Sequence, residues 1–83
     1  MAVVTVRYWA GARAAAGVDD ERLDAGSVAE LVAALAARTP ALAPVLALSS
    51  LLVDGLVVRE AARDVNALRE GQVVEVLPPF AGG

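Results

Sequence analysis

Two strand-like segments lie near opposite ends of this 83-residue chain, and the way they pair limits the folds open to it. Ala2 to Trp9 and Val73 to Leu77 are both rich in β-branched residues, and both predict β-strands. Side chains on a strand alternate between two faces, so each segment has one apolar face. The positions expected to face the core are Val4, Val6, Tyr8, Val74 and Val76. Because the intervening chain is long enough for a crossover, we predict that the segments pair in parallel at the centre of a sheet.

The clearest local signal between these segments is a helix start at Ser27. Ser27 and Glu30 have the spacing of a capping box, in which each side chain accepts a hydrogen bond from the backbone N–H of the other residue. The helix is expected to run to about Arg38, before Thr39-Pro40. Its core-facing stripe is Val28, Leu31, Val32 and Leu35. A serine here could also carry phosphopantetheine, but the Asp-Ser-Leu signature of acyl carriers is absent and capping explains Ser27.

The remaining segments predict short elements and turns. The strongest signal is Asp54-Gly55, a two-residue turn between the apolar runs 51–53 and 56–58, which predicts a β-hairpin. The others are a short helix over 10–16 ending at Gly17, a charged edge strand within 19–24, a short helical turn or apolar loop over 41–48, a polar connection over 59–66 and a turn at Glu70-Gly71. Candidates for core contact in these segments are Leu42, Val45, Leu46 and Leu68.

This order of elements predicts an α+β fold of two layers. One amphipathic helix of about eleven residues can cover one face of a small mixed sheet of four to five strands. That layout is the ubiquitin-like β-grasp. We divide the chain into a β-grasp domain over residues 1–77 and an extended, flexible, reactive tail over residues 78–83.

The side chains most often used in catalysis are missing. The sequence has no Cys, His or Lys, so the usual nucleophiles, general bases and soft metal ligands are absent, and we expect neither a metal site nor a bound cofactor. A net charge of −3 argues against nucleic acid as a partner. The apolar runs are shorter than the roughly 20 residues of a membrane span, and no signal-peptide pattern follows Met1. A chain without Cys fits the reducing cytoplasm, where we expect this protein.

The reactive group that remains is at the end of the chain. The last six residues are Pro78, Pro79, Phe80, Ala81, Gly82 and Gly83. Two prolines end a strand and favour an extended exit, one aromatic residue can anchor a partner, and two glycines can enter a narrow channel. This pattern points to the α-carboxylate of Gly83 as the working group. An ordinary frayed terminus and an expression scar ending in Gly-Gly are the alternatives.

Partner contacts are expected beside the tail. Alternation places Trp9 and Leu77 on the outer face of the sheet, where they would form a docking patch together with Phe80. Trp9 could instead cap a second small apolar cluster. Arg13 lies on the first short helix, where a solvated arginine is the ordinary interpretation.

Over its whole length the chain resembles the MoaD/ThiS family of ubiquitin-like proteins, and within it the MoaD type, the small sulfur-carrying subunit of molybdopterin synthase. The resemblance rests on VRYWAGARAAAG, on the central capped helix and on the closing LREGQVVEVLPPFAGG. Its Pro-Pro is typical of the molybdopterin type. The sequence departs from the family pattern at Gln72, where Asp is usual, and at Asp54-Gly55, where a turn containing Asn is common.

The resemblance implies a mechanism and partners. An ATP-dependent adenylyltransferase of the MoeB/ThiF type would activate the Gly83 carboxylate, a persulfide sulfur would displace AMP, and the resulting thiocarboxylate would donate sulfur in molybdenum cofactor biosynthesis. The tail would enter the large, MoaE-type subunit in a heterotetramer of two small and two large subunits. The small subunit would be non-catalytic alone, and ATP would be used by the activating partner. By resemblance Arg13 falls where the family often has Arg, and we include it among the partner contacts.

Other functions remain open at this stage. The chain could carry sulfur for thiamine or cysteine biosynthesis, or could be a protein modifier conjugated through Gly83 to target amines. A plain interaction module that binds through the surface of Trp9 and Leu77 is a third possibility. Loss of function on deleting Gly83 would favour a carrier or modifier, and unchanged activity without Gly82-Gly83 would favour the interaction module.

Overall fold

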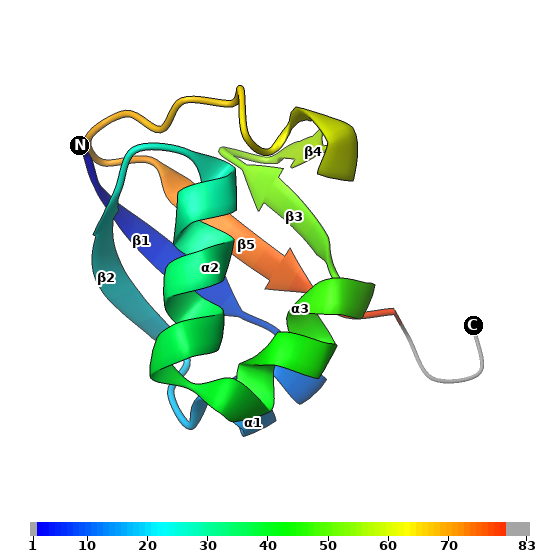
Figure 1. Ribbon diagram of the computed structural model, residues 1–83. Helices are drawn as coiled ribbons and strands as arrows, with labels where there is room; N and C mark the ends of the chain where they lie inside the picture. Colours follow the sequence, from blue (N-terminus) through cyan, green and yellow to red (C-terminus); the bar gives the residue numbers. More distant parts are fainter. Residues whose placement is uncertain (1, 80–83) are drawn as a thin grey trace.

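The last strand of the chain lies at the centre of a five-stranded sheet of strand order β2-β1-β5-β3-β4 (Figure 1). The computed structural model describes residues 2–79. Its strands are β1 (Ala2–Tyr8), β2 (Asp20–Ala25), β3 (Ser50–Val53), β4 (Leu56–Val58) and β5 (Val73–Leu77). Its helices are α1 (Gly11–Ala16), α2 (Val28–Arg38) and α3 (Ala43–Leu48), with two 3₁₀ turns, η1 (Pro40–Leu42) and η2 (Glu60–Ala62). The predicted mixed sheet with one main helix is therefore confirmed.

The predicted parallel pairing of the two end strands is also confirmed. Strand β5 runs parallel to β1, with Val6 opposite Val74 and Tyr8 opposite Val76. On its other side β5 pairs antiparallel with β3, so both of its edges are hydrogen-bonded. Strand β2 pairs antiparallel with β1 at one edge of the sheet, as its charged sequence predicted.

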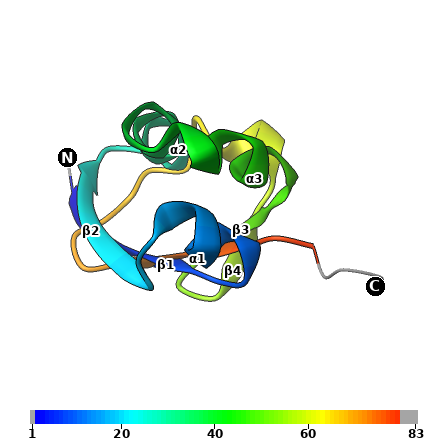
Figure 2. The ribbon, with the colours of Figure 1, turned by 90° about the horizontal axis from the view of Figure 1, so that it is seen from below.

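The core lies between the sheet and the helices on one of its faces. Helices α2 and α3 both cover the same face, and no helix of the described chain covers the other (Figure 2). All five side chains that alternation assigned to the core are buried, with exposed fractions of 2% or less. The helical contribution comes from Val28, Leu31, Leu35, Leu42 and Leu46, while Val32 and Val45 are only partly buried. Leu68 is buried, as expected of an apolar anchor.

The cap of α2 differs from the expected capping box in one bond. The Ser27 hydroxyl accepts from the Glu30 N–H at 3.2 Å, as predicted. The Glu30 carboxylate, however, accepts from the N–H of Gly26 at 3.3 Å, so the reciprocal bond to Ser27 was wrong. A Cβ on Gly26 would lie 3.2 Å from both carboxylate oxygens, and the absence of a side chain there leaves room for the carboxylate.

Several turns of the described chain use backbone with positive φ angles. Asp54 and Gly55, between β3 and β4, have φ angles of 48° and 84°, the positive values that a two-residue hairpin turn requires. At the start of α1 the predicted helix was one residue too long. Ala10 has φ 48° and ψ −122°, so it precedes the helix rather than belonging to it, and the chain changes direction there between β1 and α1. Gly17 ends α1 in the left-handed conformation, as predicted.

Candidate functional site at the exit of the tail

Strand β5 ends at Leu77 and passes directly into Pro78 and Pro79, which lie outside the sheet (Figure 1). Prolines have no N–H to give to a neighbouring strand, so the ladder cannot continue through them. Just before the exit the Trp9 N–H donates to the Val76 carbonyl at 3.2 Å, which holds the end of the first strand against the last. The predicted tail residues Phe80, Ala81, Gly82 and Gly83 lie outside the described residues.

Trp9 lies on the outer face of the sheet, in contact with charged groups. Its indole Nε1–H donates to the Glu75 carboxylate at 3.0 Å, and the Arg7 guanidinium carbon is 5.7 Å from the ring centroid, within cation–π range. The residue is 40% exposed. Leu77 is half-buried and shares the face of Glu75, two residues away. Trp9 and Leu77 therefore belong to one surface beside the exit, and Trp9 packs with polar neighbours rather than capping an apolar cluster.

Arg13 faces a small polar hollow next to Trp9. Its guanidinium is 3.8 Å from the Asp19 carboxylate, and both side chains are largely exposed. An ion pair in such a position contributes little to stability. The hollow has a volume of about 190 Å³ and is lined by Arg7, Tyr8, Trp9, Arg13, Asp19 and Asp20. The structure thus brings Arg13 close to the predicted partner surface while leaving it solvated.

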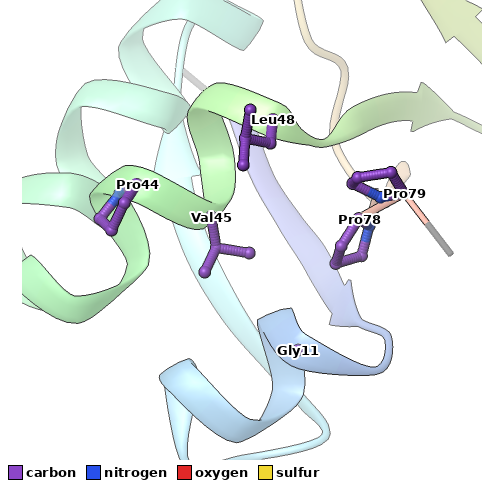
Figure 3. A pocket seen from close by; sticks show the side chains of 6 residues that line it. All are labelled: Gly11, Pro44, Val45, Leu48, Pro78 and Pro79. Atoms are coloured by element: carbon purple, nitrogen blue, oxygen red, sulfur yellow. The ribbon is translucent and has the colours of Figure 1, made fainter. Parts of the chain in front are cut away.

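A second hollow, which sequence reasoning missed, lies beside Pro78 and Pro79 at the start of the tail (Figure 3). Its volume is about 300 Å³, and its lining contains no charged residue. The lining residues are Gly11, Pro44, Val45, Leu48, Pro78 and Pro79. The signal that could have revealed it is the run from Pro40 to Leu48, nine residues without a polar side chain in a segment that lies at the surface.

A buried phenol ties the end of β1 to the edge of the domain. The Tyr8 hydroxyl donates to Glu21 of β2 at 2.6 Å, and the same carboxylate group pairs with Arg38 of α2 at 2.9 Å. Burial raises the pKa of Tyr8 above its ordinary value, and the Glu21 carboxylate raises it further. Periodicity assigned Tyr8 to the core but gave no sign of this polar chain. The network fixes the strand that precedes Trp9.

The two departures from the family pattern are in contact. The Gln72 side-chain N–H donates to the Asp54 carboxylate at 3.1 Å, and the other oxygen of Asp54 accepts from the Val73 N–H at 2.9 Å. The resemblance leads us to expect an amide in the turn and a carboxylate after the glycine, whereas in this chain the carboxylate is in the turn and the amide follows the glycine. The pair secures the start of the strand that leads to the tail.

The described residues hold neither a cluster of metal-ligating side chains nor a membrane helix. Across residues 2–79, no group of three or more His, Cys, Asp or Glu is arranged to hold a metal ion. No helix in that part of the chain is both long and apolar enough to span a bilayer. The geometry that remains is a domain whose central strand leads into Pro78 and Pro79, beside an outer surface that contains Trp9 and an apolar hollow.

A mixed five-stranded sheet on one main helix, with the parallel end strands at its centre, defines a ubiquitin-like β-grasp protein. The chain belongs to the ThiS family, whose family model matches residues 6–83. It is 32% identical over 83 residues to the molybdopterin synthase sulfur carrier subunit of Chlamydomonas reinhardtii, covering 96% of this chain and 98% of that protein. The resemblance drawn from the motifs is thereby confirmed at the level of the family.

Two solved structures have closely similar folds. The small archaeal modifier protein 1 of Methanosarcina acetivorans has a TM-score of 0.86 at 26% identity, covering 100% of this chain and 98% of that chain. A protein of Pyrococcus furiosus, provisionally named molybdopterin converting factor subunit 1, has a TM-score of 0.83 at 26% identity, covering 96% of this chain and 100% of that chain. The first is named for protein modification and the second for molybdopterin formation.

Proposed function

We propose that this protein is the sulfur carrier subunit of a molybdopterin synthase, and that the α-carboxylate of Gly83 is its working group. The observation that carries the proposal is the direct path from the central strand β5 through Pro78-Pro79 to the Gly-Gly end, in a chain of the ThiS family. The relative from C. reinhardtii, which this chain matches over nearly its full length, is named for that role.

The proposed chemistry takes place at one carbonyl carbon. The Gly83 carboxylate attacks the α-phosphorus of ATP on an adenylyltransferase of the MoeB/ThiF type, giving an acyl-adenylate and pyrophosphate. The terminal sulfur of a persulfide then attacks the carbonyl carbon and AMP leaves, which gives an acyl disulfide. A thiol of the sulfur donor or a second thiol attacks the donor-side sulfur of this bond, so that the thiocarboxylate is released and a disulfide forms between the two thiols. This is activation by group transfer, as in covalent catalysis, except that the carrier is consumed and recharged. The carrier itself binds no ATP and is not an enzyme alone.

The proposed acceptor complex contains the large, MoaE-type subunit, in a heterotetramer of two small and two large chains. The tail segment 78–83 enters the large subunit, whose basic groups stabilise the charge that develops during sulfur transfer. The contacts of the carrier outside the tail are Trp9, Leu77 and Arg13, with Phe80 as the anchor within the tail. The acidic net charge of −3 suits such a partner. Cytoplasmic activity is part of this proposal, since reduced sulfur must persist.

The test is intact-mass measurement after incubation with ATP, an activating enzyme and a sulfur donor. We expect a mass gain equal to replacement of one oxygen by sulfur, localised to Gly83 by fragmentation. A variant lacking Gly83 is the control and should gain nothing. Absence of the mass change with an activating enzyme that charges a related carrier would contradict the proposal, as would a native chain that continues past Gly83 without processing.

A second function, protein modification, has its own support. The M. acetivorans structure, with the higher TM-score of the two solved structures, is named a modifier protein. In this alternative the activated Gly83 forms an amide bond with a lysine of a target protein. A Gly-Gly remnant on target lysines after tryptic digestion would favour modification, and a thiocarboxylate on the free carrier would favour sulfur transfer.

A further inference from the structure

We propose that the apolar hollow beside the tail exit is a binding site for an aromatic side chain, and that in the free protein its occupant is Phe80 of the same chain. The hollow lies between two walls (Figure 3). Pro44, Val45 and Leu48 of α3 form one wall, and Pro78 and Pro79 form the other. Its volume of about 300 Å³ is at the lower end of the range of small-molecule pockets, enough for one large side chain.

The α3 wall has the composition of a covered surface. A helix at the surface normally carries polar residues on its outer side. Here Pro44 and Leu48, four residues apart and therefore on one side of the helix, both lie exposed, and Leu48 is 72% exposed. No polar side chain occurs between Pro40 and Leu48. Burial of this apolar surface is favourable, and a large apolar side chain buries more of it than a small or polar one.

The edge of the hollow at α1 is open because residue 11 is a glycine. Gly11 lines the hollow, and a Cβ built on it would meet no atom within 4 Å. Its backbone is not in the left-handed region, so its conformation does not require glycine. Gly11 therefore contributes open space to the hollow, because it has no side chain. A larger side chain there would enter the space that an incoming ring needs.

Phe80 is the occupant because of its position in the chain. It follows Pro79, a residue of the wall, and consecutive Cα atoms are only about 3.8 Å apart. It is the only Phe of the sequence, and an aromatic ring of this kind buries on the order of 150–250 Å². Covalent connection through a short segment also raises its effective concentration at the hollow to about the millimolar range or above.

The docked ring holds the tail against α3, on the side of the exit away from Trp9. A partner that takes up the tail must first withdraw Phe80 from the hollow, whereas the Trp9 surface stays free for the initial encounter. The hollow is thus a resting site for the tail. This inference concerns the free protein and needs no ATP, sulfur donor or partner, so its failure is distinguishable from failure of the proposed sulfur chemistry.

The direct test is NMR of the full chain with labelled methyl groups. We expect nuclear Overhauser contacts between the Phe80 ring protons and the methyl groups of Val45 and Leu48, with ring-current shifts of those methyls. Phe80→Ala should abolish both the contacts and the shifts, while Phe80→Tyr should retain them. Absence of these contacts between the Phe80 ring and the two methyl-bearing side chains in the parent protein would overturn the proposal.

Cleavage after Phe80 by an aromatic-specific protease provides a second readout, because a docked ring is protected. Leu48→Asp should accelerate cleavage several-fold, and Gly11→Leu should do the same by filling the hollow. The matched control is Leu56→Asp on β4, where the leucine is 74% exposed and does not line the hollow. It should cleave like the parent. Equal rates in Leu48→Asp and the parent would contradict the proposal.

Two further outcomes would name a different occupant and also overturn the proposal. Val45 and Leu48 methyl shifts that depend on protein concentration but not on Phe80 would show that a second copy fills the hollow. Shifts that arise only after addition of the large subunit would show that a partner does. The dependence on protein concentration is measured by a dilution series of the parent protein. Neither this series nor the comparison with Phe80→Ala depends on whether the proteins carry sulfur.

Discussion

At the scale of single residues, the contact between Asp54 and Gln72 explains a sequence peculiarity. Each residue departs from the pattern that the resemblance leads us to expect, and the two side chains are a carboxylate and an amide joined by a hydrogen bond. Asp54 also accepts from the Val73 N–H at the first residue of β5. The turn between β3 and β4 is thereby bonded to the strand that leads to the tail, which no single position in the sequence indicates.

We predict that Asp54→Ala lowers the free energy of unfolding by about 2 kcal/mol. The alanine leaves the Val73 N–H without its acceptor, and it lacks the short polar side chain that makes Asp tolerant of the left-handed backbone at φ 48°. Asp54→Asn should lose less, because Asn tolerates this backbone and its carbonyl can still accept. Urea denaturation measures both. The double change Asp54→Asn with Gln72→Asp should recover stability, and a double variant weaker than both single variants would contradict the exchange.

In the proposed docking surface, Trp9 is the residue from which we expect the largest contribution to binding. Trp9→Ala should weaken binding to the large subunit by about 1–3 kcal/mol, the range of an interface anchor, because it removes the ring between Arg7 and Glu75. Calorimetric titration measures the affinity. Leu56→Ala, also an exposed apolar position but on the edge strand β4, should bind like the parent. Unchanged affinity of Trp9→Ala would rule the assignment out.

At the scale of elements, local signals were sufficient wherever one segment determined its own structure. The helix α2, the hairpin of β3 and β4 and the terminal strands follow from capping, turn chemistry and alternation. Contacts between segments had no such signal. The Tyr8–Glu21–Arg38 chain joins β1, β2 and α2, and the apolar hollow joins α1, α3 and the tail exit. The Glu30 cap was wrong by one residue because the space over Gly26 depends on the fold around it.

The Tyr8 network predicts how stability depends on pH. The folded-state pKa of Tyr8 lies above the ordinary value of 10.0, first through burial and then through Glu21. The unfolded chain therefore loses this proton first. The contribution of the Tyr8 phenol to the free energy of unfolding is fully present below about pH 10. It is lost as the pH rises from 10 towards the higher folded-state pKa, by up to about 1.4 kcal/mol per pH unit.

Urea denaturation from about pH 8 to pH 11 measures this decline. In Tyr8→Phe the part of the decline that comes from the phenol should disappear, although the variant starts from a lower stability because Glu21 loses its hydrogen-bond donor. Since Tyr8 is the only tyrosine, the absorbance of tyrosinate in the folded protein reports its ionisation directly. A parent and variant with identical pH profiles would contradict the prediction.

At the scale of the whole molecule, the proposed function gives the domain and the tail separate tasks. The core is complete at Leu77, and all five positions that alternation assigned to it lie between the sheet and the helices. The family was recognisable from the sequence because the pattern around the exit is so specific. The proposed docking of Phe80 could not be predicted from the sequence, because it depends on α3 and the two prolines facing each other across the hollow.

Removing residues 80–83 should therefore leave the fold unchanged. We expect the free energy of unfolding to fall by about 1 kcal/mol, the equivalent of several-fold protection by the docked Phe80 ring, while charging with sulfur is lost completely. Urea denaturation and intact mass measure the two quantities on one sample. A truncated protein that unfolds much more easily would show that the tail is part of the domain, contrary to the boundary at residue 77.

The hydrogen bonds on both flanks of β5 also determine how the protein responds to force. Traction on the C-terminus is directed along the strand, and its bonds to the parallel β1 and the antiparallel β3 lie across that direction. Such bonds are loaded in shear and must rupture together, whereas an edge strand can be peeled away one bond at a time. Tension applied to the chain beyond Pro79 therefore meets resistance from two strands at once, and the domain is expected to stay folded while a partner binds the tail as proposed.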